Sequence, residues 1–377
     1  MIYLDNAATT PVPRAVADAM YQVLTEQFGN PSSQYPMGVE MKAAVERWRA
    51  VIAGALGCKA EQLYFTSCGT ESDNWAIQAA LWQNRHKGKH IITTAVEHSA
   101  VLEPCRWLAQ QGYEITCLKP GRDGNITVEQ VAAALREDTA LVSMMLVNNE
   151  TGCLFPVRDT AALLREKNSP ALLHCDAVQG FMKVDCDPEG WGVDMMSLSA
   201  HKLGGPKGIG ALYIGGRMRN PRPLLPGGGQ ERGLRSGTEA TAQIAGFAKA
   251  VELRQEHYEE KLAHMAALKE YCRAKLLDMG GVVPVGSGTA PHILAVSLVG
   301  YPSGNIVTEL GAQGICISAG SACHQGKASH VVSALGLDKK TAAGVIRISF
   351  SPDNTNEDVD ALCAALKAHR DSRFPML

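Results

Sequence analysis

The segment Ser197-Leu198-Ser199-Ala200-His201-Lys202 leads into a glycine-rich run, Leu203-Gly204-Gly205-Pro206-Lys207-Gly208-Ile209-Gly210. The apolar residues 195–198 predict a short buried strand that delivers Ser199, His201 and Lys202 at its carboxyl end. The glycines allow the backbone to turn tightly before a second apolar segment, residues 211–214.

Lys202 is expected to have less water around it than a surface lysine. Desolvation lowers the pKa of an amine and leaves a fraction of it uncharged, as Schiff-base chemistry requires. A solvated lysine beside a loop is the alternative interpretation. The choice between the two depends on which groups the other strands place nearby.

The composition is that of an ordinary soluble globular protein. Of 377 residues, 46% are apolar and 20% are charged, and the net charge is −2 without a long run of one sign. These values give no indication of binding to nucleic acid or to a membrane, and no apolar stretch reaches transmembrane length. Residues 1–5 are strand-like and leave no room for a targeting peptide, so we expect a cytoplasmic protein.

The eleven cysteines are an odd number, form no CxxC pair and lie mostly within apolar runs. A disulfide framework or a metal site is therefore not expected. Most of the cysteines should be small buried apolar side chains in a reducing compartment, with at most one or two chemically active.

Strands and helices alternate between about residues 62 and 214. Strands are predicted at 62–66, 90–95, 114–118, 141–147, 171–175, 194–198 and 210–214. Helices are predicted at 14–27, 39–56, 73–83, 101–110, 128–136 and 160–166. Strands that are apolar on both faces and joined by helices predict an α/β fold with a mostly parallel sheet covered on both sides.

The length of the chain favours two domains. A helix-prone stretch at 242–279 has few breakers and is expected to link a large domain, residues 14–250, to a small α+β domain, residues 251–377 together with 1–13. In the small domain, strands are predicted at 292–299, 314–318 and 345–350, and helices at 305–310, 331–335 and 357–368.

In open α/β sheets, ligands bind at the carboxyl ends of the strands. The strand at 62–66 is followed by Ser67-Cys68-Gly69-Thr70-Glu71-Ser72 and then by a helix. Hydroxyls and free backbone amides at a helix N-terminus suit a phosphate group. Simple N-capping by Thr70 or Ser72 is the alternative.

Polar side chains follow three more of these strands. His98 follows the strand at 90–95, where the imidazole either stacks on a planar cofactor or is structural. Asn148-Asn149-Glu150-Thr151-Gly152 follows the strand at 141–147 and either binds a substrate carboxylate or ring hydroxyl or forms a turn. Asp176 follows the strand at 171–175 and needs a cationic partner if it is buried.

Together these strand ends supply a phosphate cradle, a stacking ring, an acid for a pyridinium nitrogen and an amine for an aldehyde. Those are the groups that pyridoxal 5'-phosphate requires. Other phosphate ligands fit less well, because the chain has no GxxxxGK[ST] motif and its glycine run at 227–233 does not follow a strand.

A series of motifs then occurs in one order between residue 3 and about residue 360. They are Tyr3 to Pro11, Thr66-Ser67 with Gly69 to Asn74, Glu97-His98, Asn148 to Gly152, Asp176 to Gln179, Ser197 to Lys202, Gly227 to Thr238 and Ser318 to Cys323. In this order they resemble the motifs of the cysteine desulfurases of the NifS and IscS type. These enzymes belong to the class V aminotransferase family of fold-type I pyridoxal-phosphate enzymes.

The resemblance implies roles around the cofactor ring. Lys202 would hold the cofactor covalently and Asp176 would pair with the pyridine nitrogen. Gln179 would bond the ring hydroxyl. His98 would stack on the ring and take part in catalysis.

For the phosphate group, the resemblance implies contacts from Gly69, Thr70, Ser199 and His201. Thr238 matches a position that reaches the phosphate from the other subunit, so a homodimer is the implied state.

For the substrate, Asn149 and Arg347 match residues that bind the α-carboxylate, and Asn149 also lies among the cofactor-binding positions. A guanidinium group suits a carboxylate by its bidentate geometry. Cys323 matches the sulfur-accepting nucleophile. It also lies between small residues and the polar stretch 324–327, a setting near cations where a thiolate is plausible.

The implied activity is removal of sulfur from L-cysteine, which gives L-alanine and a persulfide on Cys323. The persulfide would pass to a sulfur-acceptor protein in iron–sulfur cluster assembly or thiolation. Selenocysteine lysis or transamination by the same cofactor are alternatives. A sulfur-carrier platform that is active only with a bound partner is an alternative of another class.

The chain departs from the family pattern at three places. Cys68 stands where the family usually has glycine, and the segment from Cys323 to His330 is about two residues shorter than usual and lacks a Glu-Pro pair. Residues 371–377 do not resemble the longer tail with which the housekeeping type docks its scaffold. The sequence therefore does not identify the acceptor.

Overall fold

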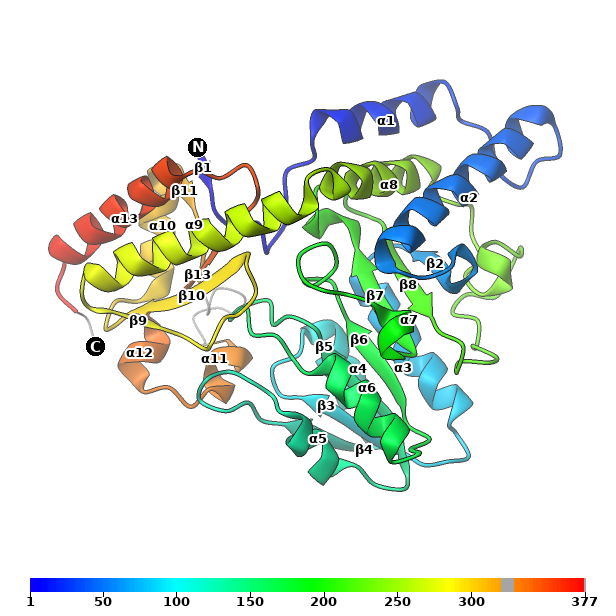
Figure 1. The fold of residues 1–377 in the computed structure, drawn as a ribbon, viewed down its shortest axis with the longest axis horizontal. Coiled ribbons are helices and arrows are strands. Elements are labelled where there is room, and N and C mark those ends of the chain that lie inside the picture. Colours follow the sequence, from blue (N-terminus) through cyan, green and yellow to red (C-terminus); the bar gives the residue numbers. More distant parts are fainter. Residues whose placement is uncertain (320–328, 376–377) are drawn as a thin grey trace.

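The computed structural model describes residues 1–319 and 329–375, and its centre is a seven-stranded sheet (Figure 1). The strand order is β2-β8-β7-β6-β5-β3-β4, with β8 antiparallel to both of its neighbours and the other pairs parallel. The bounds are β2 Leu63–Thr66, β3 His90–Thr94, β4 Glu114–Leu118, β5 Thr139–Met145, β6 Leu172–Asp176, β7 Met195–Ser199 and β8 Gly210–Ile214. The expected α/β class and mostly parallel sheet are confirmed.

Helices cover both faces of this sheet, because successive strand residues point to opposite sides and both sets are apolar. Ile91, Leu172 and Met195 belong to a cluster with α3 (Gly69–Gln83) and α4 (Ser99–Gln110). The residues next in sequence, Ile92, Leu173 and Met196, belong to a larger cluster on the other face. The helices of that face are α1 Arg14–Thr25, α2 Pro36–Leu56, α5 Val128–Ala134, α6 Val157–Glu166, α7 Pro188–Trp191 and α8 Thr241–Gln255.

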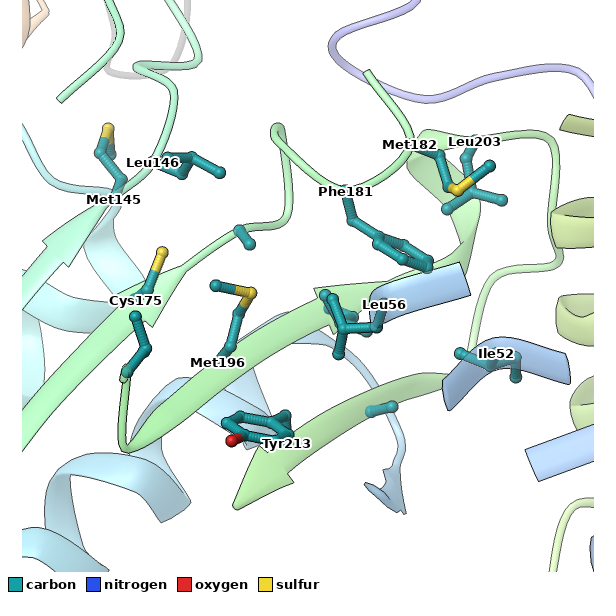
Figure 2. Packing of buried hydrophobic residues seen from close by; sticks show 14 of the residues in the cluster. Ile52, Leu56, Met145, Leu146, Cys175, Phe181, Met182, Met196, Leu203 and Tyr213 are labelled. Carbon is teal, nitrogen blue, oxygen red and sulfur yellow. The ribbon is translucent and has the colours of Figure 1, made fainter. Parts of the chain in front are cut away.

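The larger cluster supports the strands that carry the polar residues. Figure 2 shows Ile52 and Leu56 of α2 near the strands that carry Met196 and Tyr213. Phe181, from the turn after β6, is almost wholly buried in the same cluster. Dense packing of this kind holds the carboxyl ends of β6 and β7 in a fixed place relative to each other.

A second, antiparallel sheet lies beside the first (Figure 1), with the strand order β12-β13-β10-β9. Its strands are β9 Val282–Pro284, β10 Ile293–Leu298, β12 Ser318–Ala319 and β13 Val345–Ser349. Helices α9 (Tyr258–Asp278), α10 (Ser303–Ala312) and α13 (Asn356–Asp371) cover it and share a separate apolar core. The short helices α11 (His330–Ala334) and α12 (Lys339–Ala343) complete this part of the chain.

The helix-prone stretch 242–279 forms two helices, α8 and α9, and not one. The chain turns between them at His257, which has a positive φ of 51°. Phe247 and Val251 of α8 pack into the core of the large sheet, whereas Met265 and Leu268 of α9 pack into the core of the small sheet. The turn lets each helix face its own core, and this depends on tertiary packing that helix propensity does not report.

The N-terminal segment connects the two sheets. Strand β1 (Ile2–Tyr3) pairs in parallel with β11 (Ile315–Cys316). The backbone amide of Ala7 then donates to the Ser349 hydroxyl at 2.8 Å, and the amide of Thr10 donates to the His201 carbonyl at 3.0 Å. The segment thus crosses from the small sheet to the carboxyl end of β7. Nowhere in the described chain is a helix both long and apolar enough to cross a membrane.

Candidate active site

A cavity of about 380 Å³ lies at the carboxyl ends of β5, β6 and β7, between the large sheet, the N-terminal segment and β13. Ten of the residues that the sequence proposed line it. They are Gly69, Thr70, His98, Asn149, Asp176, Gln179, Ser199, His201, Lys202 and Arg347. The structure therefore brings residues from widely separated parts of the chain into one cavity.

Lys202 lies in a 3₁₀ turn, Ala200–Lys202, directly after β7. Its Nζ donates to the carbonyl oxygens of Ala7 at 2.9 Å and Ala8 at 2.7 Å. Burial, together with the guanidinium of Arg347, lowers the pKa of Lys202 to about 8, against the opposing effect of Asp176 and Asp5. Near neutral pH, part of this amine is therefore free to act as a nucleophile or base.

Asp176 is the last residue of β6 and is buried in the wall of the cavity. Its Oδ1 accepts a hydrogen bond from the backbone amide of Val178 at 2.9 Å. Its pKa rises to about 7 because burial and the neighbouring Asp73 both disfavour the charged form. The described protein therefore leaves this carboxylate without sufficient cationic compensation, and a protonated ring nitrogen in the cavity would supply it.

Asp73, from the first turns of α3, is buried and also lines the cavity, and its Oδ1 accepts no hydrogen bond from the described residues. Burial raises the pKa of Asp73 to about 7. The nearest cation-forming group is His174 Nε2, at 3.5 Å, but burial lowers the pKa of this imidazole to about 4. Near neutral pH the imidazole is therefore uncharged and leaves the carboxyl without a charged partner.

The cavity reaches the N-terminus of α3, where Cys68, Gly69 and Thr70 line it. Cys68, the residue before the helix, makes no capping hydrogen bond with its side chain, so the first amides of the helix are open to an anion. A Cβ at Gly69 would lie 2.7 Å from Val178 Cγ2, so only glycine fits there without displacement. Ser199 and His201 line the same cavity.

His98 caps α4: its Nδ1 accepts from the Ala100 amide at 3.2 Å. In the neutral ring the proton is therefore on Nε2. Burial lowers the pKa of His98, while Asp176 opposes the change. Two hydrogen bonds orient the side-chain amide of Gln179. Its Nε2 donates to the Ala7 carbonyl at 2.8 Å, and its Oε1 accepts from the buried Lys183 at 3.1 Å.

Arg347, in β13, reaches the cavity from the small sheet. Its guanidinium donates to the Asn149 carbonyl at 2.8 Å, to Asp5 Oδ1 at 2.8 Å and to Ser318 Oγ at 3.1 Å. Its buried Nε finds no acceptor among the described residues. An unused donor on a buried guanidinium is suited to a carboxylate ligand.

Two predicted residues do not line the cavity. Thr238 is exposed and lies just after the loop formed by residues 224–236. Cys323 lies outside the described residues. The roles of both stay predictions.

Four contributors were not assigned a role from the sequence: the Ala7 and Ala8 carbonyls, Asp5 and Asp73. Each of them lies within a motif that suggested the resemblance. Their contacts join segments nearly 200 or more residues apart, or depend on burial, and neither local spacing nor propensity contains that information.

The fold and the cavity define a member of the class V aminotransferases, and the family model described as "Aminotransferase class-V" matches residues 2–362. The chain is 41% identical to "Cysteine desulfurase IscS" of Methanosarcina thermophila, over 95% of this chain and 89% of that one. It is 43% identical to "Cysteine desulfurase 2" of Trichormus variabilis, over 96% of this chain and 90% of that one.

Solved structures agree. A "NIFS-LIKE PROTEIN" superposes with a TM-score of 0.92 at 36% identity, over 99% of this chain and all of that one. A NifS-like protein from Rickettsia africae gives 0.86 at 28% identity, over 98% and 99% of the two chains. The chain belongs to the cysteine desulfurases, within the class V aminotransferase family of fold-type I enzymes.

Proposed function

We propose that this protein is a pyridoxal-phosphate-dependent cysteine desulfurase that converts L-cysteine to L-alanine and leaves a persulfide on Cys323. The observation that carries the proposal is the single cavity that contains the desolvated Lys202, the uncompensated Asp176 and the open N-terminus of α3. Membership in the cysteine desulfurases supports L-cysteine as the substrate that binds in this cavity.

The residues present fit pyridoxal 5'-phosphate, because the cavity offers a buried acid without a cation and an anion site on an uncapped helix. Lys202 would hold the aldehyde carbon, Asp176 the pyridine nitrogen, and His98 one face of the ring. The other contacts would come from Gly69, Thr70, Ser199 and His201 to the phosphate, and from Gln179 and Asn149 at the ring edge. When bound, the group accepts the electron pair released at the substrate α-carbon.

The chain's own residues then bind the substrate and move protons. Arg347, whose Nε has no acceptor among the described residues, holds the α-carboxylate, and Asn149 contributes beside it. Lys202, with a pKa near 8, takes and returns the proton at the substrate α-carbon. The Ala7 and Ala8 carbonyls, which accept from its Nζ, hold this amine in place within the cavity.

The sulfur step belongs to Cys323. Its thiolate forms a sulfur–sulfur bond with the substrate thiol while the carbon–sulfur bond breaks. The electron pair of the broken bond stays with the carbon skeleton, which takes up a proton and leaves as alanine. No external oxidant is required, because the carbon is reduced as the two sulfur atoms join.

We further propose a homodimer that works in the cytoplasm and passes the persulfide to a sulfur-acceptor protein. The exposure of Thr238, away from its own cavity, supports a role for this residue in the partner subunit.

The test is an assay of alanine formation from L-cysteine by Cys323→Ser, with Cys316→Ser as the matched control on β11. Cys323→Ser should lose turnover and still bind the cofactor, whereas Cys316→Ser should keep turnover. Full turnover by Cys323→Ser would remove this thiol from the mechanism and favour transamination.

A further inference from the structure

The turn that precedes Thr238 is closed by backbone hydrogen bonds. The amide of Leu224 donates to the Leu234 carbonyl at 2.8 Å, and the amide of Ser236 donates to the Leu225 carbonyl at 2.9 Å. Residues 224–236 therefore form a compact loop, and the exposed Thr238 follows directly where the loop ends.

Two residues at the tip of this loop have an unfavourable backbone conformation. Glu231 has φ +47° and Arg232 has φ +57°. Side chains with a Cβ rarely adopt this left-handed region, and consecutive examples persist only where the surroundings impose them. Strain of this kind is characteristic of ligand clamps and active sites.

The structure that imposes the conformation is a buried ion pair. Arg49 of α2 donates from both terminal nitrogens to Glu231, at 2.7 and 2.8 Å, and each of the two side chains is only 4% exposed. The same carboxylate also accepts from the Phe65 amide of β2, at 2.8 Å. A bidentate guanidinium and a backbone amide on one carboxylate leave the tip of the loop little freedom.

A second pair ties the end of the loop to the phosphate cradle. Arg235 Nε donates to Glu71 Oε1 at 2.8 Å, and Glu71 lies in the first turn of α3, next to Thr70. The loop is thus held at its tip by α2 and β2, and near its end by α3. Both attachments are to its own subunit.

We propose that Arg49 and Glu231 are positioning residues for the cofactor phosphate: their buried pair holds the strained loop so that Thr238 is already oriented toward the partner subunit's site. The inference rests on the proposed homodimer and on the proposed phosphate contact of Thr238. A loop that is ordered before binding does not lose its freedom when the phosphate arrives, and this favours affinity.

The experiment measures the dissociation constants of pyridoxal 5'-phosphate and of pyridoxal, which lacks the phosphate, for the apoenzyme. Glu231→Gln keeps the shape of the side chain and removes its charge. It should weaken binding of the phosphorylated cofactor by roughly tenfold and leave the affinity for pyridoxal unchanged. Asp138→Asn, which breaks the exposed pair with Arg136, is the control and should change neither constant.

Thr238→Ala closes the test as a double-mutant cycle. If Glu231 acts through Thr238, Glu231→Gln should weaken binding little further in the Thr238→Ala background. The proposal would be overturned if the two substitutions raised the dissociation constant of pyridoxal 5'-phosphate by factors that multiply fully. It would also be overturned if Glu231→Gln weakened the binding of pyridoxal equally. If Thr238→Ala alone does not weaken phosphate binding, the proposed contact of Thr238 itself is wrong.

Arg49→Lys keeps the buried positive charge and removes the bidentate hydrogen bond to Glu231. This second variant tests the proposal if Glu231→Gln does not fold. It should weaken the binding of phosphorylated cofactor selectively, by a smaller factor, in an apoenzyme that still unfolds cooperatively. Unchanged affinity for both ligands in this folded variant would contradict the proposal.

Discussion

At the scale of single residues, the chemistry of the site depends on ionisable side chains whose charged forms are poorly compensated. Among the described residues, Lys202 donates to two carbonyl oxygens, which hold an ammonium without neutralising it. Asp73 and Asp176 lie close together in the interior, and no ion pair in the part of the chain that the structure describes compensates both. These residues keep a pKa near neutrality because the charged forms are poorly supported, as acid–base chemistry at neutral pH requires.

The first prediction concerns the amine of Lys202. Its covalent attachment to pyridoxal 5'-phosphate, trapped by cyanoborohydride and measured by mass spectrometry, should rise with pH and reach half of its maximum near pH 8. The free amine reacts, and burial places its pKa near 8 instead of the ordinary value. Lys202→Ala should trap nothing at this position. A rate that still climbs steeply above pH 9 would contradict a desolvated lysine.

The second prediction concerns Asp5, which occupies the guanidinium of Arg347 at 2.8 Å. Asp5→Asn removes a charge that competes with the substrate carboxylate, so KM for L-cysteine should fall by roughly threefold to tenfold. Because Asp5 also raises the pKa of Lys202, the midpoint of the trapping profile should move to lower pH. A higher KM would show that Asp5 orients Arg347 more than it competes.

The third prediction concerns the stability of the apoenzyme. Asp73 has a folded-state pKa of about 7, above its unfolded value, so the folded state favours the protonated acid. Its contribution to stability is therefore full below about pH 4 and is lost as pH rises to about 7. Asp73→Asn should raise the free energy of unfolding at pH 8 by about 2 kcal/mol, with a smaller gain at pH 5. Urea unfolding at the two pH values measures the difference, and an equal gain at both would contradict it.

At the scale of elements, the N-terminus of α3 is shaped by close packing and not by a capping side chain. Gly69 begins the helix where the side chain of Val178, from the turn after β6, occupies the space that a Cβ would need. The helix thereby starts four residues earlier than the predicted residue 73, because the small polar residues before that position are helical here. Propensity favoured a loop for these residues, whereas the packing against Val178 and Ser199 makes them the first turn.

The fourth prediction compares two glycines in helices. Gly69→Ala places a methyl 2.7 Å from Val178 Cγ2. It should therefore destabilise the protein by about 1–3 kcal/mol and weaken the binding of the phosphorylated cofactor. Gly54→Ala, within α2, meets nothing within 4 Å and should stabilise by about 1 kcal/mol. Urea unfolding measures the change in stability of both variants, and cofactor titration measures the change in their affinity for pyridoxal 5'-phosphate. An unaffected Gly69→Ala would show that Val178 moves aside easily.

At the scale of the whole molecule, the sequence predicted the alternation of elements and the strand ends where the site lies. The strands β4 and β8 have the predicted bounds, because their apolar runs end at residues that disfavour strands. What it did not predict depends on contacts between distant segments: the turn at His257 and the carbonyls of Ala7 and Ala8. The division into residues 14–250 and 251–377 with 1–13 stays a proposal.

The fifth prediction tests whether two subunits complete one site. Lys202 lines the cavity of its own subunit, whereas we propose that Thr238 contacts the phosphate in the partner subunit's cavity. Substitutions of the two residues can therefore be placed in the same chain or in different chains of the dimer. A heterodimer with Lys202→Ala in one chain and Thr238→Ala in the other has one site with both residues intact. It should retain about half of the wild-type activity at low cofactor concentration.

The matched heterodimer carries both substitutions in one chain and none in the other. Its only intact Lys202 then lacks the hydroxyl from the partner, so half-saturation should require roughly tenfold more pyridoxal 5'-phosphate. Differential tags allow both heterodimers to be purified and titrated side by side. If Thr238 acted within its own subunit, the order would reverse, because the doubly substituted chain would then leave one complete site untouched.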